Sequence, residues 1–234
     1  MRRVAFALAL LISAVATAQS PFQGPNPWPA IRKERIATLL PGAMSRASVD
    51  AWVVMLRENA NDPLALHVGG ENAGAPAAAV FLRSGDRVRS VMLSGFGEAI
   101  ALRELGLHDS VVVYPGTLED AIAERLRGAR PTRIAINSGG ALGVADGLSY
   151  AQRARLEAAL GPEYAPRLVP AAAMVTDWLS VKLPSEVEIM RRAARLTAQL
   201  EFEAYATVVA GRSRGTDIAR FLKRRMRELG VEDG

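Results

Sequence analysis

Short apolar runs in the first half of the chain predict the strands of a sheet. Residues 50–56 are apolar after Asp50 and rich in β-forming types, which is typical of a buried strand. Two further runs, 77–83 and 88–93, flank a Ser-Gly-Asp segment that favours a hairpin turn. Later runs at 111–114 and 133–137 complete the set of strands that we expect.

Apolar residues at helical spacing predict the helices. The first such pattern covers 30–40, and we expect Pro41 and the glycine after it to interrupt the helix. Thr117 and Ser149 each precede an acidic or amide residue by three positions, which is the signature of a capping box at a helix start. The helix that Ser149 opens should end at Gly161. Strands first, followed by alternating helices and strands, indicate an α/β domain with a mixed sheet and helices on its faces.

The pattern changes near Asp177, after which two amphipathic helices are expected. Ser185 and Glu188 have the form of a third capping box, and apolar residues recur at helical intervals over 189–209. After a glycine-containing break, Thr216 should cap a final helix. Because two amphipathic helices by themselves expose an apolar face, they require a partner layer.

The N-terminus has the pattern of an export signal. A pair of arginines precedes the uncharged residues 4–18, which end in Ala-Thr-Ala, so we expect a signal peptide over 1–18 that is cleaved after Ala18. An uncleaved membrane anchor is the alternative. The proline-rich residues 19–29 predict an extended arm. The mature protein is therefore expected to be secreted or periplasmic, with no membrane segment after cleavage.

Composition narrows the class of protein. Half of the 234 residues are apolar and 23% are charged, which is typical of a folded globular chain. The formal charge of +5 comes from arginines interleaved with Asp and Glu, so we expect no nucleic-acid surface. The chain has no cysteine, which excludes disulfides, thiol nucleophiles and cysteine-ligated metals. Any mechanism that needs a histidine must use His67 or His108.

The most distinctive polar cluster directly follows the strand at 50–56. It contains Arg57, Asn59 and Asp62, and loop residues at the end of a strand often face a ligand. We take these three residues and His67, which lies shortly before two glycines, as candidates for facing a substrate. The alternative is a capped surface loop and a structural histidine.

Other kinds of chemistry find little support in the sequence. The glycines at 95–97 and 139–143 lack the spacing of a nucleotide-binding loop, and no Gly-x-Ser-x-Gly nucleophile motif occurs. The acidic residues after Asp177 fall on polar helix faces or in a first helical turn, with no histidine among them. We therefore assign no catalytic residue, no cofactor site and no metal ligand within the chain.

Two stretches resemble one family of hydrolases. The strand at 50–56, followed by Arg-Glu-Asn-Ala-Asn-Asp-Pro at 57–63, resembles the opening of creatinase, prolidase and Xaa-Pro aminopeptidase proteins. Residues 181–193 (VKLPSEVEIMRRA), then Gly-x3-Gly-Thr-Asp at 211–217 and Met-x3-Gly at 226–230, resemble the linker and first two helices of that family's catalytic domain. The second match is more specific, because its parts occur in the family's order and spacing.

The resemblance implies a ribonuclease-H-like α/β domain over 30–177 and the beginning of a pita-bread catalytic domain over 178–234. In the family's peptidases two divalent ions (manganese, cobalt or zinc) are held by two aspartates, one histidine and two glutamates. The substrate is a short peptide, and a homodimer is frequent. The family's metal ligands lie beyond its first two helices, so none is carried over to this sequence. The chain is expected to be a fragment that is inactive alone.

Three interpretations remain open at this point. The first is the N-terminal part of an exported metallopeptidase of the Xaa-Pro aminopeptidase or prolidase type. The second is a fragment of a creatinase-like hydrolase, which uses no metal. The third is a non-catalytic periplasmic module that binds a small ligand or a partner through the loop at 57–63.

Overall fold

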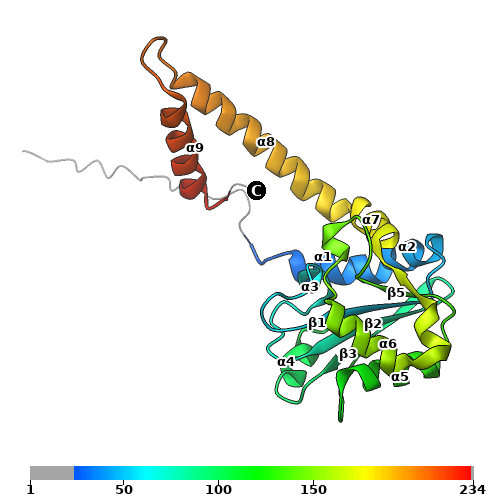
Figure 1. Cartoon of the computed structure of the whole chain (residues 1–234). Coiled ribbons are helices and arrows are strands. Elements are labelled where there is room, and N and C mark those ends of the chain that lie inside the picture. The colour runs from blue at the N-terminus through cyan, green and yellow to red at the C-terminus, as the bar shows by residue number, and fades with distance from the viewer. Residues whose placement is uncertain (1–23, 233–234) are drawn as a thin grey trace, which may run out of the picture. The chain divides into compact units, whose positions relative to one another are not determined.

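The computed structural model describes residues 24–232 (Figure 1). The expected signal peptide and most of the expected arm therefore lie outside the described residues. Contacts separate a compact unit, Asn26–Val187, which we call the body, from a second unit that contains residues 188–232, which we call the helical hairpin.

The body is built on a six-stranded sheet with the order β4-β3-β2-β1-β5-β6. β2 is antiparallel to both of its neighbours and every other pair is parallel, so five strands point the same way. The α/β class and the mixed sheet expected from the sequence are thus confirmed. The strands are β1 (Ala51–Leu56), β2 (Ala77–Ser84), β3 (Arg87–Ser94), β4 (Ser110–Val113), β5 (Ile134–Ile136) and β6 (Leu168–Pro170).

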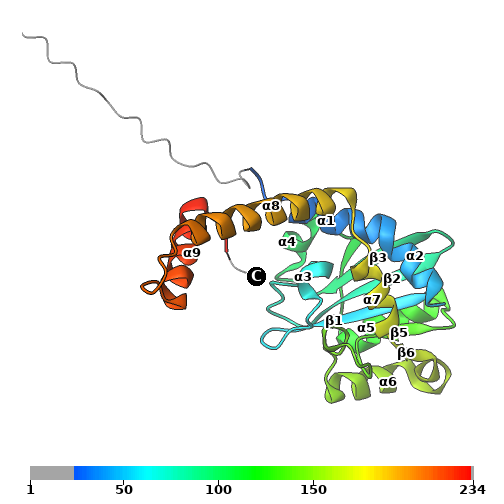
Figure 2. The same ribbon diagram turned by 90° about the horizontal axis from the view of Figure 1, so that it is seen from above.

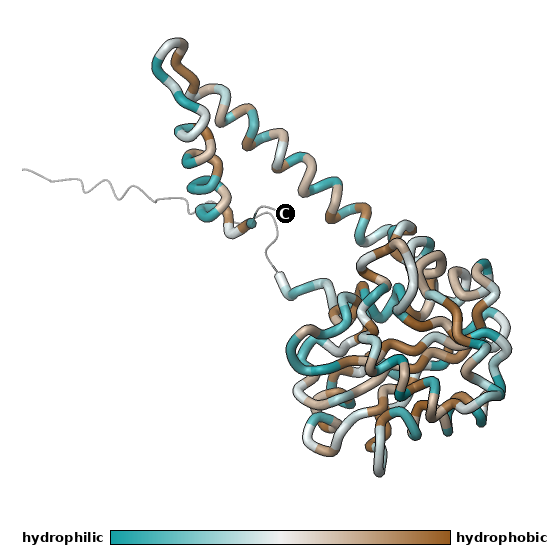
Figure 3. Tube along the Cα trace, viewed as in Figure 1, coloured by the Kyte–Doolittle hydropathy of each residue, from teal (hydrophilic) through white to brown (hydrophobic). Residues whose placement is uncertain are grey.

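Helices cover both faces of this sheet (Figures 1 and 2). Along β1 the side chains alternate, so that Trp52 packs with α2, α3 and α7 while Val53 packs with α5 and α6. Apolar residues accordingly concentrate along the strands (Figure 3). The helical segments of the body are α1 (Trp28–Glu34), a π turn (Arg35–Leu39), α2 (Leu40–Arg46), α3 (Ala65–Val68), α4 (Ala99–Glu104), α5 (Leu118–Ala129), α6 (Tyr150–Tyr164) and α7 (Ala172–Ser180), with short 3-10 turns at Gly143–Ala145 and Ala165–Arg167.

The first helical segment continues through Pro41, so the expected interruption there is wrong. A π turn separates α1 from α2 and places Pro41 in the first turn of α2. A proline is accepted at that position, because an N–H in a first turn has no partner within the helix. For the same reason Pro29 fits the first turn of α1, and Trp28 and Pro29 are helical where an extended arm was expected.

The two capping residues of the middle of the chain are confirmed. The Thr117 hydroxyl accepts a hydrogen bond from Asp120 N, and Ser149 forms a complete capping box with Gln152. The helix that Ser149 opens leaves helical geometry at Gly161, as expected, with a φ of 71°; one further helical turn after this kink completes α6.

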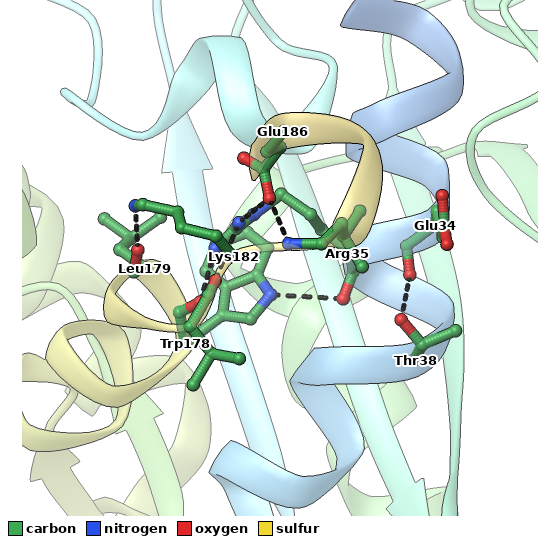
Figure 4. A network of polar contacts seen from close by, with 9 residues as sticks. Glu34, Arg35, Thr38, Trp178, Leu179, Lys182 and Glu186 are labelled. Carbon is green, nitrogen blue, oxygen red and sulfur yellow. Dashed lines mark hydrogen bonds and ion pairs between the residues drawn. The ribbon is translucent and has the colours of Figure 1, made fainter. Parts of the chain in front are cut away.

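The start of α8 (Pro184–Ala206) is held by a buried arginine of the π turn (Figure 4). Arg35 is 2% exposed, and its guanidinium donates to the Trp178 carbonyl, to the Val181 carbonyl at 3.0 Å and to Glu186 Oε2 at 2.6 Å. Trp178 Nε1 in turn donates to the Arg35 carbonyl at 3.2 Å. The end of α7 and the first turn of α8 are therefore both tied to the π turn.

The helix α8 begins at Pro184, so the capping box expected at Ser185 is wrong. Glu186 Oε2 accepts from Leu183 N at 2.8 Å, which makes Glu186 the residue that reaches back to the helix start. The displacement has a physical reason: Pro184 is favoured at the first helical position, and Glu186 is drawn inward by Arg35.

The helical hairpin consists of the rest of α8 and α9 (Gly215–Leu229). Arg225 Nε donates to Glu203 Oε2 at 2.8 Å and joins the two helices. The start of α9 is capped at Arg214, whose backbone N–H donates to Asp217 Oδ2 at 3.0 Å, so the expected cap at Thr216 is wrong by two positions. Within residues 24–232, no helix is long and apolar enough to cross a membrane.

The Arg35 contacts should dominate the stability of this end of the body. Arg35→Met would remove the donor of two carbonyls and the cation that pairs with the Glu186 carboxylate, so we expect the free energy of unfolding to fall by about 3–5 kcal/mol. Arg46→Met is the matched control, because it removes the exposed ion pair with Asp177 and should change that free energy by less than about 1 kcal/mol. Urea unfolding followed by circular dichroism measures both. Equal losses in the two variants would contradict this assignment.

Candidate functional site

The candidate site lies where the parallel strands end at one edge of the sheet. β1 and β5 are parallel neighbours, so the loop after β1 and the loop after β5 leave the sheet side by side. In α/β proteins this edge is the usual place for a ligand, because loops from several strands meet there.

Arg57 follows the last residue of β1 and crosses toward the start of α6. Its backbone N–H donates to Asn61 Oδ1 at 3.1 Å and its Nε to the Ala60 carbonyl at 2.7 Å. Its Nη1 donates to Gln152 Oε1 at 2.9 Å. The side chain therefore holds its own loop closed and also reaches the first turn of α6.

Asn59 lies at the exposed tip of the same loop. Asn59 and Ala60 have φ values of 49° and 53°, in the left-handed region that asparagine tolerates and alanine rarely adopts. Asn59 lines a shallow depression together with Arg57 and Asn72. The loop thus presents Asn59 to solvent while its base is fastened to the body.

Asp62 points inward, away from solvent. It is 2% exposed, and Asn137 Nδ2 donates to both of its carboxylate oxygens at 3.0 Å. Leu64 N donates to Oδ1 at 2.9 Å, and Trp52 Nε1 donates to Asn137 Oδ1 at 2.9 Å. Burial raises the pKa of the Asp62 carboxyl, although these hydrogen bonds and Arg57 oppose the shift.

A glycine is required beside Asp62. A Cβ atom at Gly147 would lie 2.3 Å from Asp62 Oδ2 and 2.6 Å from Pro63 Cδ, so only glycine lets the loop after β5 pass this close to the carboxylate. Asp62 is therefore buried between the two loops and joins them.

His67 lies apart from this edge, in α3. Its ring makes edge contacts with Trp28 and Trp178, at centroid distances of 5.2 and 5.9 Å. Burial lowers the pKa of His67, and Arg35 and Lys182 lower it further while Glu186 opposes them. The other histidine, His108, is half-buried, with Nε2 at 2.9 Å from the Val68 carbonyl.

The structure therefore brings only two of the four candidates together, since Arg57 and Asn59 share the shallow depression while Asp62 and His67 lie elsewhere. Of the four, Arg57 alone also lines a second cleft. This cleft, of about 490 Å³, lies between the N-terminal ends of α5 and α6. Gln152 and Arg155 of α6 and Tyr114 after β4 also line it, and none of them was singled out as a site residue. Gln152 was recognised as a capping residue, which is the signal that could have placed it beside Arg57.

The described residues do not fit a metal centre. Among residues 24–232, no three His, Cys, Asp or Glu side chains converge on one point. The cleft is lined by hydrogen-bond donors of Arg57, Arg155 and Gln152 and by apolar residues such as Met55 and Leu118.

Neither a protein-family model nor a curated protein matches the sequence, whereas the fold matches solved structures. The chain matches an Xaa-Pro dipeptidase from Bacillus anthracis with a TM-score of 0.52 at 15% identity, over 86% of this chain and 49% of that one. It matches an X-Pro aminopeptidase from Thermotoga maritima MSB8 with a TM-score of 0.52 at 16% identity, over 80% and 49%. It matches the dipeptidase PepE from Mycobacterium ulcerans with a TM-score of 0.52 at 20% identity, over 84% and 50%.

At these identities the likeness shows a shared fold. The expected resemblance to Xaa-Pro peptidases is confirmed at that level. The chain spans about half the length of each of these three structures, so the likeness concerns only part of each.

The environment of His67 predicts a pH dependence of stability. Because folding lowers the pKa of His67 below its ordinary value of 6.5, neutral His67 stabilises the body above that pH, and this stability is lost as the pH falls through the pKa of the folded state. His67→Phe keeps a ring against Trp28 and Trp178 but cannot titrate. The wild-type protein should therefore lose stability relative to His67→Phe between about pH 7 and pH 5.

Urea unfolding of both proteins at the two pH values measures this difference. The pKa of His108 is also lowered by burial, but His108 is present in both proteins and its contribution cancels. A pH dependence that is the same in both proteins would show that His67 does not titrate in this range.

Proposed function

We propose that this chain is the N-terminal part of an exported metallopeptidase of the Xaa-Pro aminopeptidase or prolidase type. In this proposal the body is the domain that precedes the catalytic domain, and the helical hairpin is the start of the catalytic domain. The observation that carries the proposal is the extent of the fold match. The match to the B. anthracis structure covers 86% of this chain. The body ends at Val187, so the body and all residues before it are too few to account for that share. The match must therefore include part of the helical hairpin.

The surface of the helical hairpin supports the second half of the proposal. Met190, Phe202 and Tyr205 on α8, with Val208 and Val209 just after it, are all at least half exposed. Large apolar side chains that gather on one small unit mark a surface that another layer covers. The remainder of a catalytic domain would provide that layer.

The metal site of the proposed enzyme belongs to residues other than those described. Because the side chains of 24–232 do not form a group that fits a metal, we place the two divalent ions (manganese, cobalt or zinc) on ligands outside this part of the chain. In this proposal the body holds no metal, and its role is to support the catalytic domain and to help select short peptides. A homodimer is part of the same proposal, by analogy with the family.

Export is proposed from the sequence pattern. The arginine pair, the uncharged residues 4–18 and the Ala-Thr-Ala site together favour cleavage after Ala18 and a periplasmic location.

The proposal is tested by comparing this chain with the product of a longer reading frame. DNA downstream of codon 234 should continue in frame and encode two aspartates, one histidine and two glutamates in that order. The longer product, loaded with Mn²⁺, should cleave Xaa-Pro dipeptides and lose this activity with a chelator. The 234-residue chain under the same conditions should cleave none and bind no stoichiometric Mn²⁺ by calorimetry.

Two results would overturn the proposal. One is chelator-sensitive cleavage of an Xaa-Pro dipeptide by the purified 234-residue chain. The other is a longer product that binds metal but leaves Xaa-Pro dipeptides intact, with an Xaa-Ala dipeptide as the matched control substrate.

A further inference from the structure

We propose that the cleft between the starts of α5 and α6 binds a small organic carboxylate that carries an apolar group, of the size of an amino acid or a dipeptide. This inference concerns the body alone and does not rest on the proposed peptidase function. It follows from the volume of the cleft, from one buried amide with a donor to spare, and from the charges on the walls.

The cleft has the size and lining of a site for a small molecule. Its volume of about 490 Å³ falls in the range of ligand pockets. Apolar wall is supplied by Met55, Pro76, Leu118 and Ala151, while the polar groups come from α5, α6 and the end of β1. A ligand with one apolar and one polar end would match this division.

Gln152 supplies the observation that points to the chemistry of the polar end. The residue is 7% exposed and lines the cleft. Its Oε1 accepts from Arg57 Nη1 at 2.9 Å, from Ser149 N at 3.1 Å and from Ser149 Oγ at 3.0 Å, which fixes the orientation of the amide. Among the described residues, no acceptor takes a hydrogen bond from Gln152 Nε2. The NH₂ group is not one of the fully buried unpaired atoms of the described residues, so it is open to the cleft that Gln152 lines, where it can donate to a ligand.

Arg57 provides a second donor beside that amide. Its Nε and Nη1 are engaged by the Ala60 carbonyl and by Gln152, whereas within residues 24–232 its Nη2 has no partner. Because Arg57 Nη1 lies 2.9 Å from Gln152 Oε1, the guanidinium and the amide are neighbours on the wall of the cleft. A guanidinium N–H and an amide N–H are donors that a carboxylate accepts with its two oxygens.

The other charges near the cleft do not cancel this preference. The Glu119 carboxylate is 13% exposed and is neutralised by Arg155 Nε at 2.8 Å. Asp120, at the start of α5, accepts from the Thr117 hydroxyl at 2.6 Å. Asp62 is near enough for Arg57 to lower its pKa, but among the described residues Arg57 makes no direct ion pair, and a carboxylate ligand would supply one.

The test is calorimetric titration of the purified 234-residue chain with N-acetyl-leucine, and with N-acetyl-leucinamide as the matched uncharged probe. N-acetyl-leucine should bind saturably, and the amide should bind about tenfold more weakly, since it loses the charge-assisted hydrogen bonds. Gln152→Glu keeps the oxygen that Arg57 and Ser149 need but replaces the NH₂ by a negative oxygen. This variant should fold like the wild type and lose binding by about tenfold or more.

A second variant and a control complete the experiment. Arg57→Met should also lose binding, whereas Arg125→Met, which removes an exposed arginine farther along α5, should bind like the wild type. The inference is overturned if N-acetyl-leucine shows no saturable binding up to about 10 mM. It is equally overturned if the amide binds as well as the acid, or if Gln152→Glu binds like the wild type. Because the titration needs neither metal nor peptide cleavage, its failure leaves the proposed peptidase function untouched.

Discussion

The arrangement of the carboxyl edge depends on one buried amide, that of Asn137. It accepts a hydrogen bond from Trp52 of β1 and donates to both oxygens of Asp62, so a single side chain links the sheet to the loop that follows β1. With Asp62 held inside, the loop must turn back through left-handed residues, and Arg57 is left on the side of α6. The geometry of the cleft is thus a consequence of a polar contact in the core.

A second buried polar side chain, that of Arg35, likewise joins segments that are distant in the sequence. The Arg35 guanidinium satisfies two carbonyls at the end of α7 and the carboxylate that caps α8. A buried cation with this many partners is specific in geometry, since each lost partner would leave a desolvated group unpaired. The residues that resemble a family's interdomain linker are therefore part of the packed body at their start.

The sequence was sufficient for the elements whose signal is local. The fully buried strand β1, the hairpin between β2 and β3 and the caps at Thr117 and Ser149 are each specified by a few consecutive residues. The contacts at the candidate site and at the start of α8 could not be predicted in this way. Arg57 and Gln152 are 95 positions apart, Asp62 and Asn137 are 75 apart, and Arg35 and Glu186 are 151 apart. Asp62 was a candidate for facing a substrate because its partner, Asn137, follows β5 and is distant in the sequence.

The role of the Asp62–Asn137 contact is tested most directly by a double-mutant cycle, built from Asp62→Ala, Asn137→Ala and the pair. If this contact fixes the loop, the two changes are strongly non-additive, with a coupling free energy of about 1–3 kcal/mol in urea unfolding. The Arg57 side-chain resonances should shift in the same way in both single variants. Additive losses of stability, with unchanged Arg57 resonances, would show that the loop is held by something else and would contradict the account.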